Sequence, residues 1–150
     1  MKPMIRALTV MLVLTTFCPP AVAGERDLVA ALVPGDIKSA RLNLNSWGPH
    51  LGFESEIDGD DPRMVALVSV IRNAEPAQGH KCANSGAIRF LMAGGGVIAV
   101  GLLPSHSEGF FNFRLYNGDS LESVYRVQQE LLFTALAELG VPLDDPAFYD

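Results

Sequence analysis

The residues best suited to chemistry lie in two polar stretches that each carry a histidine. His80-Lys81-Cys82 offers an imidazole and a thiol two positions apart, and Ser105-His106-Ser107-Glu108 adds a second imidazole. A thiolate and an imidazole together can bind Zn or Cu, and a neighbouring base can also convert a cysteine into a nucleophile. His80 and Cys82, with His106 as a third group, are therefore a candidate metal site or catalytic site.

The spacing of these residues weakens both interpretations. A structural zinc site generally takes four ligands in a closed pattern, which is not found here. Ser105 to Glu108 places a hydroxyl, an imidazole and a carboxylate together in sequence, whereas a catalytic triad is assembled from separate elements. No Gly-x-Ser-x-Gly motif is present. Metal handling or catalysis is therefore the alternative hypothesis, and no cofactor is expected.

Two further motifs have simpler explanations. Glu54 to Asp61 places acidic residues at alternate positions, as a calcium-binding loop does, but the twelfth position holds Val65 instead of the required Glu. The sequence favours a solvated loop whose last residue, Asp61, caps a helix. Gly94-Gly95-Gly96 lies between two expected strands, so it predicts a hairpin turn and not a phosphate-binding loop.

Hydrophobic periodicity predicts the strands that would position these groups. Residues 37–45 alternate between apolar and polar side chains, which is typical of a strand with one buried face. Residues 86–92, 97–103 and 110–116 predict three more strands. Because the connections between these three are short, an antiparallel meander is the expected arrangement.

Helical spacing predicts the remaining elements. A short helix is expected over 25–33 and a second over 62–74, where Asp61-Pro62 is a favourable start. A long helix is expected over 121–139, with Asp119 and Glu122 as a capping box and Gly140 at its carboxyl end.

These elements predict an α+β fold in one domain over residues 24–150. The antiparallel sheet has about four strands, one N-terminal strand plus the three-stranded meander. The middle helix and the long C-terminal helix pack on one face. The uncovered face would present Arg89, Asn112 and Arg114, and His106 would lie in a loop at the tip of the meander. These four are the candidate binding residues.

The first 23 residues read as a cleaved signal peptide. Lys2 and Arg6 precede an uncharged run over 7–17, Pro19-Pro20 ends it, and Ala21-Val22-Ala23 provides a cleavage site after Ala23. The run is too short to span a bilayer, so no membrane association is expected after cleavage. The prediction is a periplasmic or secreted protein in which Cys82 is the one remaining cysteine.

Charge narrows the class of partner. Loss of Lys2 and Arg6 with no acidic residue changes the formal charge from −6 to −8. Nucleic acid is therefore disfavoured, because proteins that bind it present basic surfaces to phosphate. The favoured hypothesis is a small non-catalytic protein that binds another macromolecule, most naturally a protein, as an inhibitor or immunity protein does. A module that binds a small ligand in a pocket between the C-terminal helix and the sheet is a further alternative.

Overall fold

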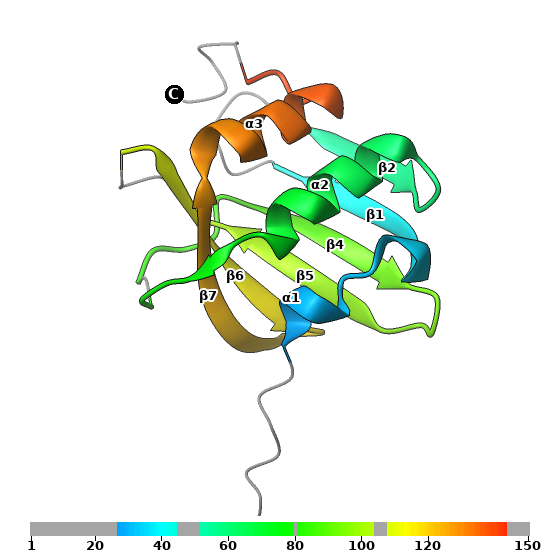
Figure 1. Cartoon of the computed structure of the whole chain (residues 1–150), viewed down its shortest axis with the longest axis horizontal. Coiled ribbons are helices and arrows are strands. Elements are labelled where there is room, and N and C mark those ends of the chain that lie inside the picture. The colour runs from blue at the N-terminus through cyan, green and yellow to red at the C-terminus, as the bar shows by residue number, and fades with distance from the viewer. Residues whose placement is uncertain (1–26, 45–51, 80, 104–107, 144–150) are drawn as a thin grey trace, which may run out of the picture.

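The computed structural model describes residues 27–44, 52–79, 81–103 and 108–143. The predicted signal peptide, His80 and His106 lie outside these residues. Within them the chain has an α+β fold built on one antiparallel sheet (Figure 1). No helix in these segments has the length and apolar character needed to cross a membrane.

The described sheet has seven strands, where the sequence predicted about four. Their spatial order is β2-β1-β4-β5-β6-β7-β3, and every neighbouring pair is antiparallel. The strands are β1 (Ile37–Asn43), β2 (Glu54–Asp58), β3 (Glu75–Pro76), β4 (Gly86–Met92), β5 (Val97–Leu102), β6 (Phe110–Asn117) and β7 (Ser120–Gln128). The strand predicted over 37–45 is confirmed over 37–43 as β1, and the predicted meander is confirmed as β4 to β6 at the centre of the sheet. Residue 45 lies outside the described residues.

The helices are α1 (Leu28–Ala31), α2 (Pro62–Arg72) and α3 (Gln129–Glu138), with a short 3₁₀ turn, η1 (Pro34–Asp36), before β1. α2 begins as predicted, because the Asp61 carboxylate accepts a hydrogen bond from the backbone N–H of Arg63 at 2.9 Å. Gly140 follows α3 with a φ of 86°, the left-handed conformation expected of a residue that ends a helix.

The prediction of one long helix over 121–139 is wrong in its first half. Residues 120–128 form β7, which pairs with β6 through the turn at Gly118 and Asp119. Asp119 therefore lies in a hairpin turn and does not cap a helix. The register between β6 and β7 shifts between Leu115 and Tyr116, which inserts an extra residue into β7.

The acidic stretch was also predicted incorrectly as a loop. Residues 54–58 form the edge strand β2, which pairs with β1. Ile57 is the buried member of this strand, while Glu54, Glu56 and Asp58 are exposed. Edge strands are often short and rich in charged residues, and with one buried apolar residue β2 shows almost no apolar alternation in its sequence.

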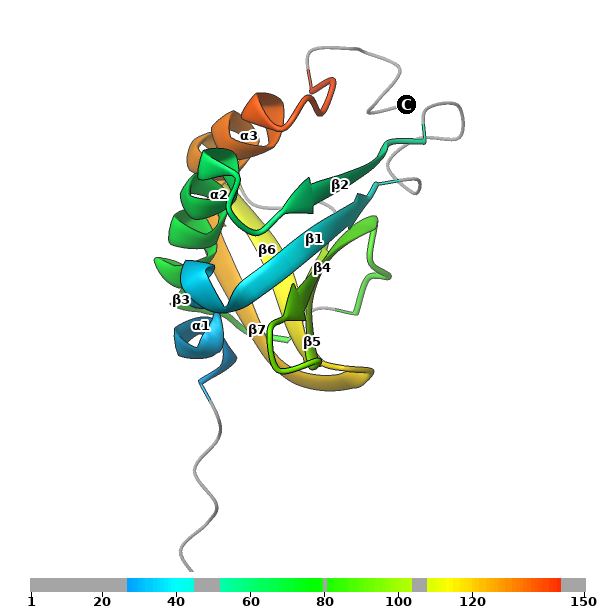
Figure 2. The ribbon, with the colours of Figure 1, turned by 90° about the vertical axis from the view of Figure 1, so that its right-hand side faces the viewer.

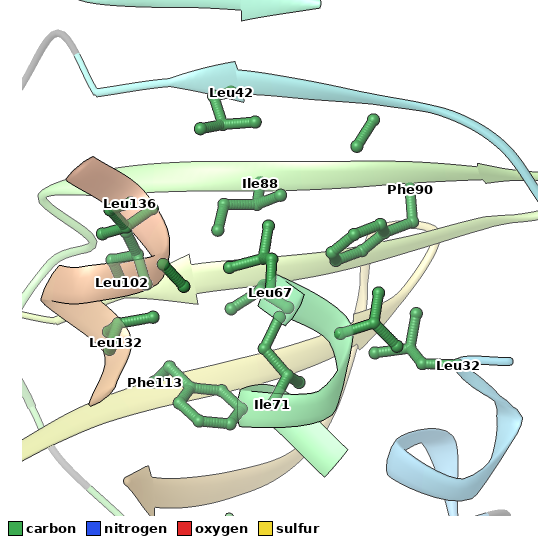
Figure 3. Packing of buried hydrophobic residues seen from close by; sticks show 14 of the residues in the cluster. Leu32, Leu42, Leu67, Ile71, Ile88, Phe90, Leu102, Phe113, Leu132 and Leu136 are labelled. Atoms are coloured by element: carbon green, nitrogen blue, oxygen red, sulfur yellow. The ribbon is translucent and has the colours of Figure 1, made fainter. Parts of the chain in front are cut away.

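The core lies between the sheet and the three helices, which all lie on one side of it (Figure 2). Phe90 and Phe113 of the sheet and Leu67 of α2 are essentially inaccessible to solvent. Figure 3 shows how the sheet and helix side chains interlock, and those it labels are Leu32, Leu42, Leu67, Ile71, Ile88, Phe90, Leu102, Phe113, Leu132 and Leu136. Each fully buried side chain of this kind contributes about 1.5–3 kcal/mol, so this layer determines which face of the sheet is covered.

Candidate functional site

The outer sheet face, defined as the face opposite the helices, carries the polar side chains that the sequence singled out. Ala40 and Leu42 point into the core, so the alternating Arg41 and Asn43 of β1 point outward. The strand registers place Arg41 beside Arg89 of β4, followed by Ala99 of β5 and Tyr116 of β6. The next row runs Asn43, Ala87, Gly101 and Arg114.

The segment before β4 adds a residue to this face that sequence reasoning missed. β3 lies at one edge of the sheet and β4 lies in the middle, and the contacts of Asn84 place the end of the connection between them on the outer face. Asn84, near the end of this segment, lies against Gly101 of β5. Its Nδ2 donates to the Tyr116 hydroxyl at 3.2 Å, and its Oδ1 accepts from Arg114 Nη1 at 3.2 Å.

Small residues leave two open hollows in the outer face. The first, which we call the β1–β4 recess, has a volume of about 360 Å³ and is lined by Arg41, Asn43, Asn84, Gly86, Ala87 and Arg89. The second is about 490 Å³ and extends toward Tyr116 and Asp119. Asn84, Ala87 and Arg89 line both, so they stand at the centre of the candidate site.

The charges around the recess are unevenly matched. Arg41 is the cross-strand partner of Glu56 in β2, and its guanidinium lies 3.8 Å from a carboxylate oxygen of Glu54. Asn43 Nδ2 also donates to Glu54 Oε1 at 2.9 Å. Arg89 is exposed, and among the described residues no acidic side chain lies within 4.0 Å of its guanidinium.

The predicted binding residues are therefore brought together only in part. Arg89 and Arg114 lie on either side of Asn84, as expected for an uncovered polar face. Asn112 lies one row further along β6, opposite Arg126, and lines neither hollow. Arg41 also lines the recess, although it is not among the predicted binding residues. Its sequence signal is its alternation with buried residues in a predicted strand.

The alternative site at His80, Cys82 and His106 is described only at Cys82. Its side chain is partly exposed and forms no disulfide. In the described segments, no group of three histidine, cysteine or acidic side chains is arranged to hold a metal ion. The hypothesis that these three residues converge stays a prediction, because both histidines lie outside the described residues.

The interface between α3 and the sheet is filled by apolar side chains, where Leu132 lies beside Phe113 and Leu136 beside Leu102 (Figure 3). A hollow of about 450 Å³ lies at the start of α3 and is lined in part by Phe110 and Phe133. It lies at the amino-terminal end of the helix, and its lining includes no residue of the central strands β4 and β5. The small-ligand hypothesis also stays a prediction.

One pKa in the described residues is strongly shifted, and it belongs to a structural group. Hydrogen bonds from the Arg63 guanidinium, the shortest at 2.6 Å, lower the pKa of Asp61 to about 2. Asp61 caps α2, which lies on the helix side of the sheet, and it lines neither hollow of the outer face. The shift therefore reports a helix cap and not a catalytic acid.

Comparison of the chain with protein-family models, curated protein sequences and solved structures gave no match in any of the three. The functional argument therefore rests on the residues of the outer sheet face.

Proposed function

We propose that this chain is a small exported, non-catalytic binding protein that docks another protein on its outer sheet face, in the manner of an inhibitor or immunity protein. One observation carries the proposal: the three described helices all cover one face of a wide sheet, and the opposite face presents polar side chains around two hollows. Export is supported by the sequence of residues 2–23.

The composition of this face suits a protein partner. Arginine and tyrosine are enriched in protein interfaces, because both combine a large contact area with specific hydrogen bonds. Arg41, Arg89, Arg114 and Tyr116 are supplied by three strands of one sheet, so their backbones are fixed before binding. A preorganised surface of this kind loses little conformational entropy when a partner docks.

The test compares the same substitution on the two faces. Ala87→Tyr places a phenol ring in both hollows, whereas Ala137→Tyr adds the same group to an exposed position of α3. Each purified protein is used to retain partners from the exported proteins of its own host, with circular dichroism as the check on folding.

We expect one stoichiometric partner to be retained by the unmodified protein and by Ala137→Tyr, and to be lost with Ala87→Tyr. Equal retention by the two variants would place the interface elsewhere. Failure of the unmodified protein to retain any partner would refute the docking function.

A further inference from the structure

We propose that the β1–β4 recess accepts a carboxylate side chain of the docked protein and that Arg89 is the residue that binds it. This inference rests on the proposed function and assigns the chemistry of the partner. It comes from the pairing of two arginines across neighbouring strands. Arg41 and Arg89 are direct cross-strand partners on the outer face.

Like charges directly opposite each other destabilise a sheet unless another charge compensates them. Arg41 has that compensation from Glu54 at 3.8 Å and from Glu56, its partner in β2. Arg89 is next to Ala99 on its other side, and among the described residues no acidic side chain lies within 4.0 Å of its guanidinium. Asp119 shares the second hollow with Arg89 but does not line the recess. The missing countercharge therefore belongs at the Arg89 side of the recess.

The lining of the recess already binds a carboxylate of the chain itself. Glu54 accepts a hydrogen bond from Asn43 at 2.9 Å and lies beside Arg41, so two of the lining residues contact this group. Arg89 offers the same planar guanidinium, which suits two parallel hydrogen bonds to a carboxylate. Ala87, whose side chain is a single methyl group, leaves the space that a second carboxylate would fill.

A single carboxylate fits this surface better than a polyanion does. Glu54, Glu56 and Asp58 point outward from β2, because their register partners are Asn43, Arg41 and Ser39. This acidic row lies two strands from Arg89, about 10 Å away at the usual strand spacing. A nucleic acid or a membrane of anionic lipids would be repelled by the row. A complementary partner would place an acidic residue at Arg89 and a basic residue about 10 Å away, at the acidic row of β2.

The experiment uses a probe that does not require the partner to be known. The purified protein is titrated with N-acetyl-glutamate amide and, as the neutral control, N-acetyl-glutamine amide, at constant ionic strength. Backbone amide shifts are followed by NMR.

We expect saturable shifts in β1 and β4 around Arg41 and Arg89 with the glutamate probe only. Arg89→Gln should weaken binding about three- to tenfold, in line with the loss of one exposed charge-assisted contact. Arg72→Gln, an exposed arginine on the helix side, should leave the affinity unchanged.

Equal shifts with both probes, or unchanged affinity in Arg89→Gln, would overturn the carboxylate site even where a partner docks on the outer face. Binding of the glutamate probe without any partner in the retention experiment would instead overturn the docking function, and with it the assignment of the carboxylate to a protein. The two failures are therefore distinguishable.

Discussion

The position of Asn84 over Gly101 can be tested by a double-mutant cycle. A Cβ atom added at Gly101 would lie 2.6 Å from Asn84 Nδ2 and 2.7 Å from its Cγ and Oδ1. Alanine at position 101 must therefore push the Asn84 side chain away. The backbone of β5 need not move, because the three nearest atoms all belong to that side chain.

The cost follows from the contacts that Asn84 makes. Its hydrogen bonds to Tyr116 and Arg114 are each 3.2 Å long. At about 0.5–1 kcal/mol for each bond at an exposed position, their loss destabilises the protein by about 1–2 kcal/mol. Replacement of a strand glycine by alanine offsets about 0.5–1 kcal/mol of this, because the unfolded chain loses entropy.

In the Asn84→Ala background the obstruction is gone, so Gly101→Ala should stabilise the protein by about 0.5–1 kcal/mol. The expected coupling energy between the two positions is therefore about 1–2 kcal/mol. Urea unfolding of the four proteins measures it. An identical effect of Gly101→Ala in both backgrounds would refute the placement of Asn84 and with it the shape of both hollows.

Three further predictions concern the fold that supports this face. Gly59→Ala would place its Cβ in the backbone of β1 and should cost about 1–3 kcal/mol in thermal unfolding, whereas Gly35→Ala has open space and should be neutral or slightly stabilising. Leu136→Ala should lower the free energy of unfolding by about 2–5 kcal/mol, while Leu131→Ala, 49% exposed, should change it by less than about 0.5 kcal/mol; similar losses would contradict the orientation of α3. Because the folded-state pKa of Asp61 is depressed from 3.8 to about 2, its charge stabilises the fold above pH 4 and this contribution is lost as the pH falls toward 2. The difference in free energy of unfolding between Asp61→Asn and the unmodified protein should therefore shrink as the pH is lowered from 4 to 2. A difference that stays constant over this range would be evidence against the shifted pKa.

The central strands and α2 were predictable, because each carries an unambiguous local signal. β1 alternates strictly around Leu42, and β4 and β5 are apolar runs bounded by a glycine turn. Asp61 followed by proline marks the start of α2. These signals also placed Arg89 and Arg114 correctly on the uncovered face of the sheet.

Asn84 could not be predicted, because its place depends on strand order. Nothing local in the polar segment before β4 reveals that three strands separate its two ends. The segment begins beyond β7, where β3 pairs with that strand, and ends with Asn84 against Gly101 of β5. Sites made by such crossings are visible only when the topology is known.

β7 shows why periodicity alone gave a helix. In β7, Ser123, Tyr125 and Val127 pair with inward residues of β6, while Leu121 and Val124 pair with outward ones. The extra residue in the bulge makes the two outward apolar residues three apart instead of two. Together with Tyr125, they reproduce helical spacing within an extended strand.

This substitution of strand for helix changes the width of the sheet and leaves the same face uncovered as in the predicted fold. A helix over 121–139 would have supplied a second long element to cover a sheet of about four strands. Instead the sheet gains β7 and, through it, β3, while α3 is limited to residues 129–138. The three described helices are enough to cover one face of this wider sheet. The bulge that concealed β7 in the sequence therefore hid the extent of the outer face, while the strands that carry Arg41, Arg89 and Arg114 could be predicted without it.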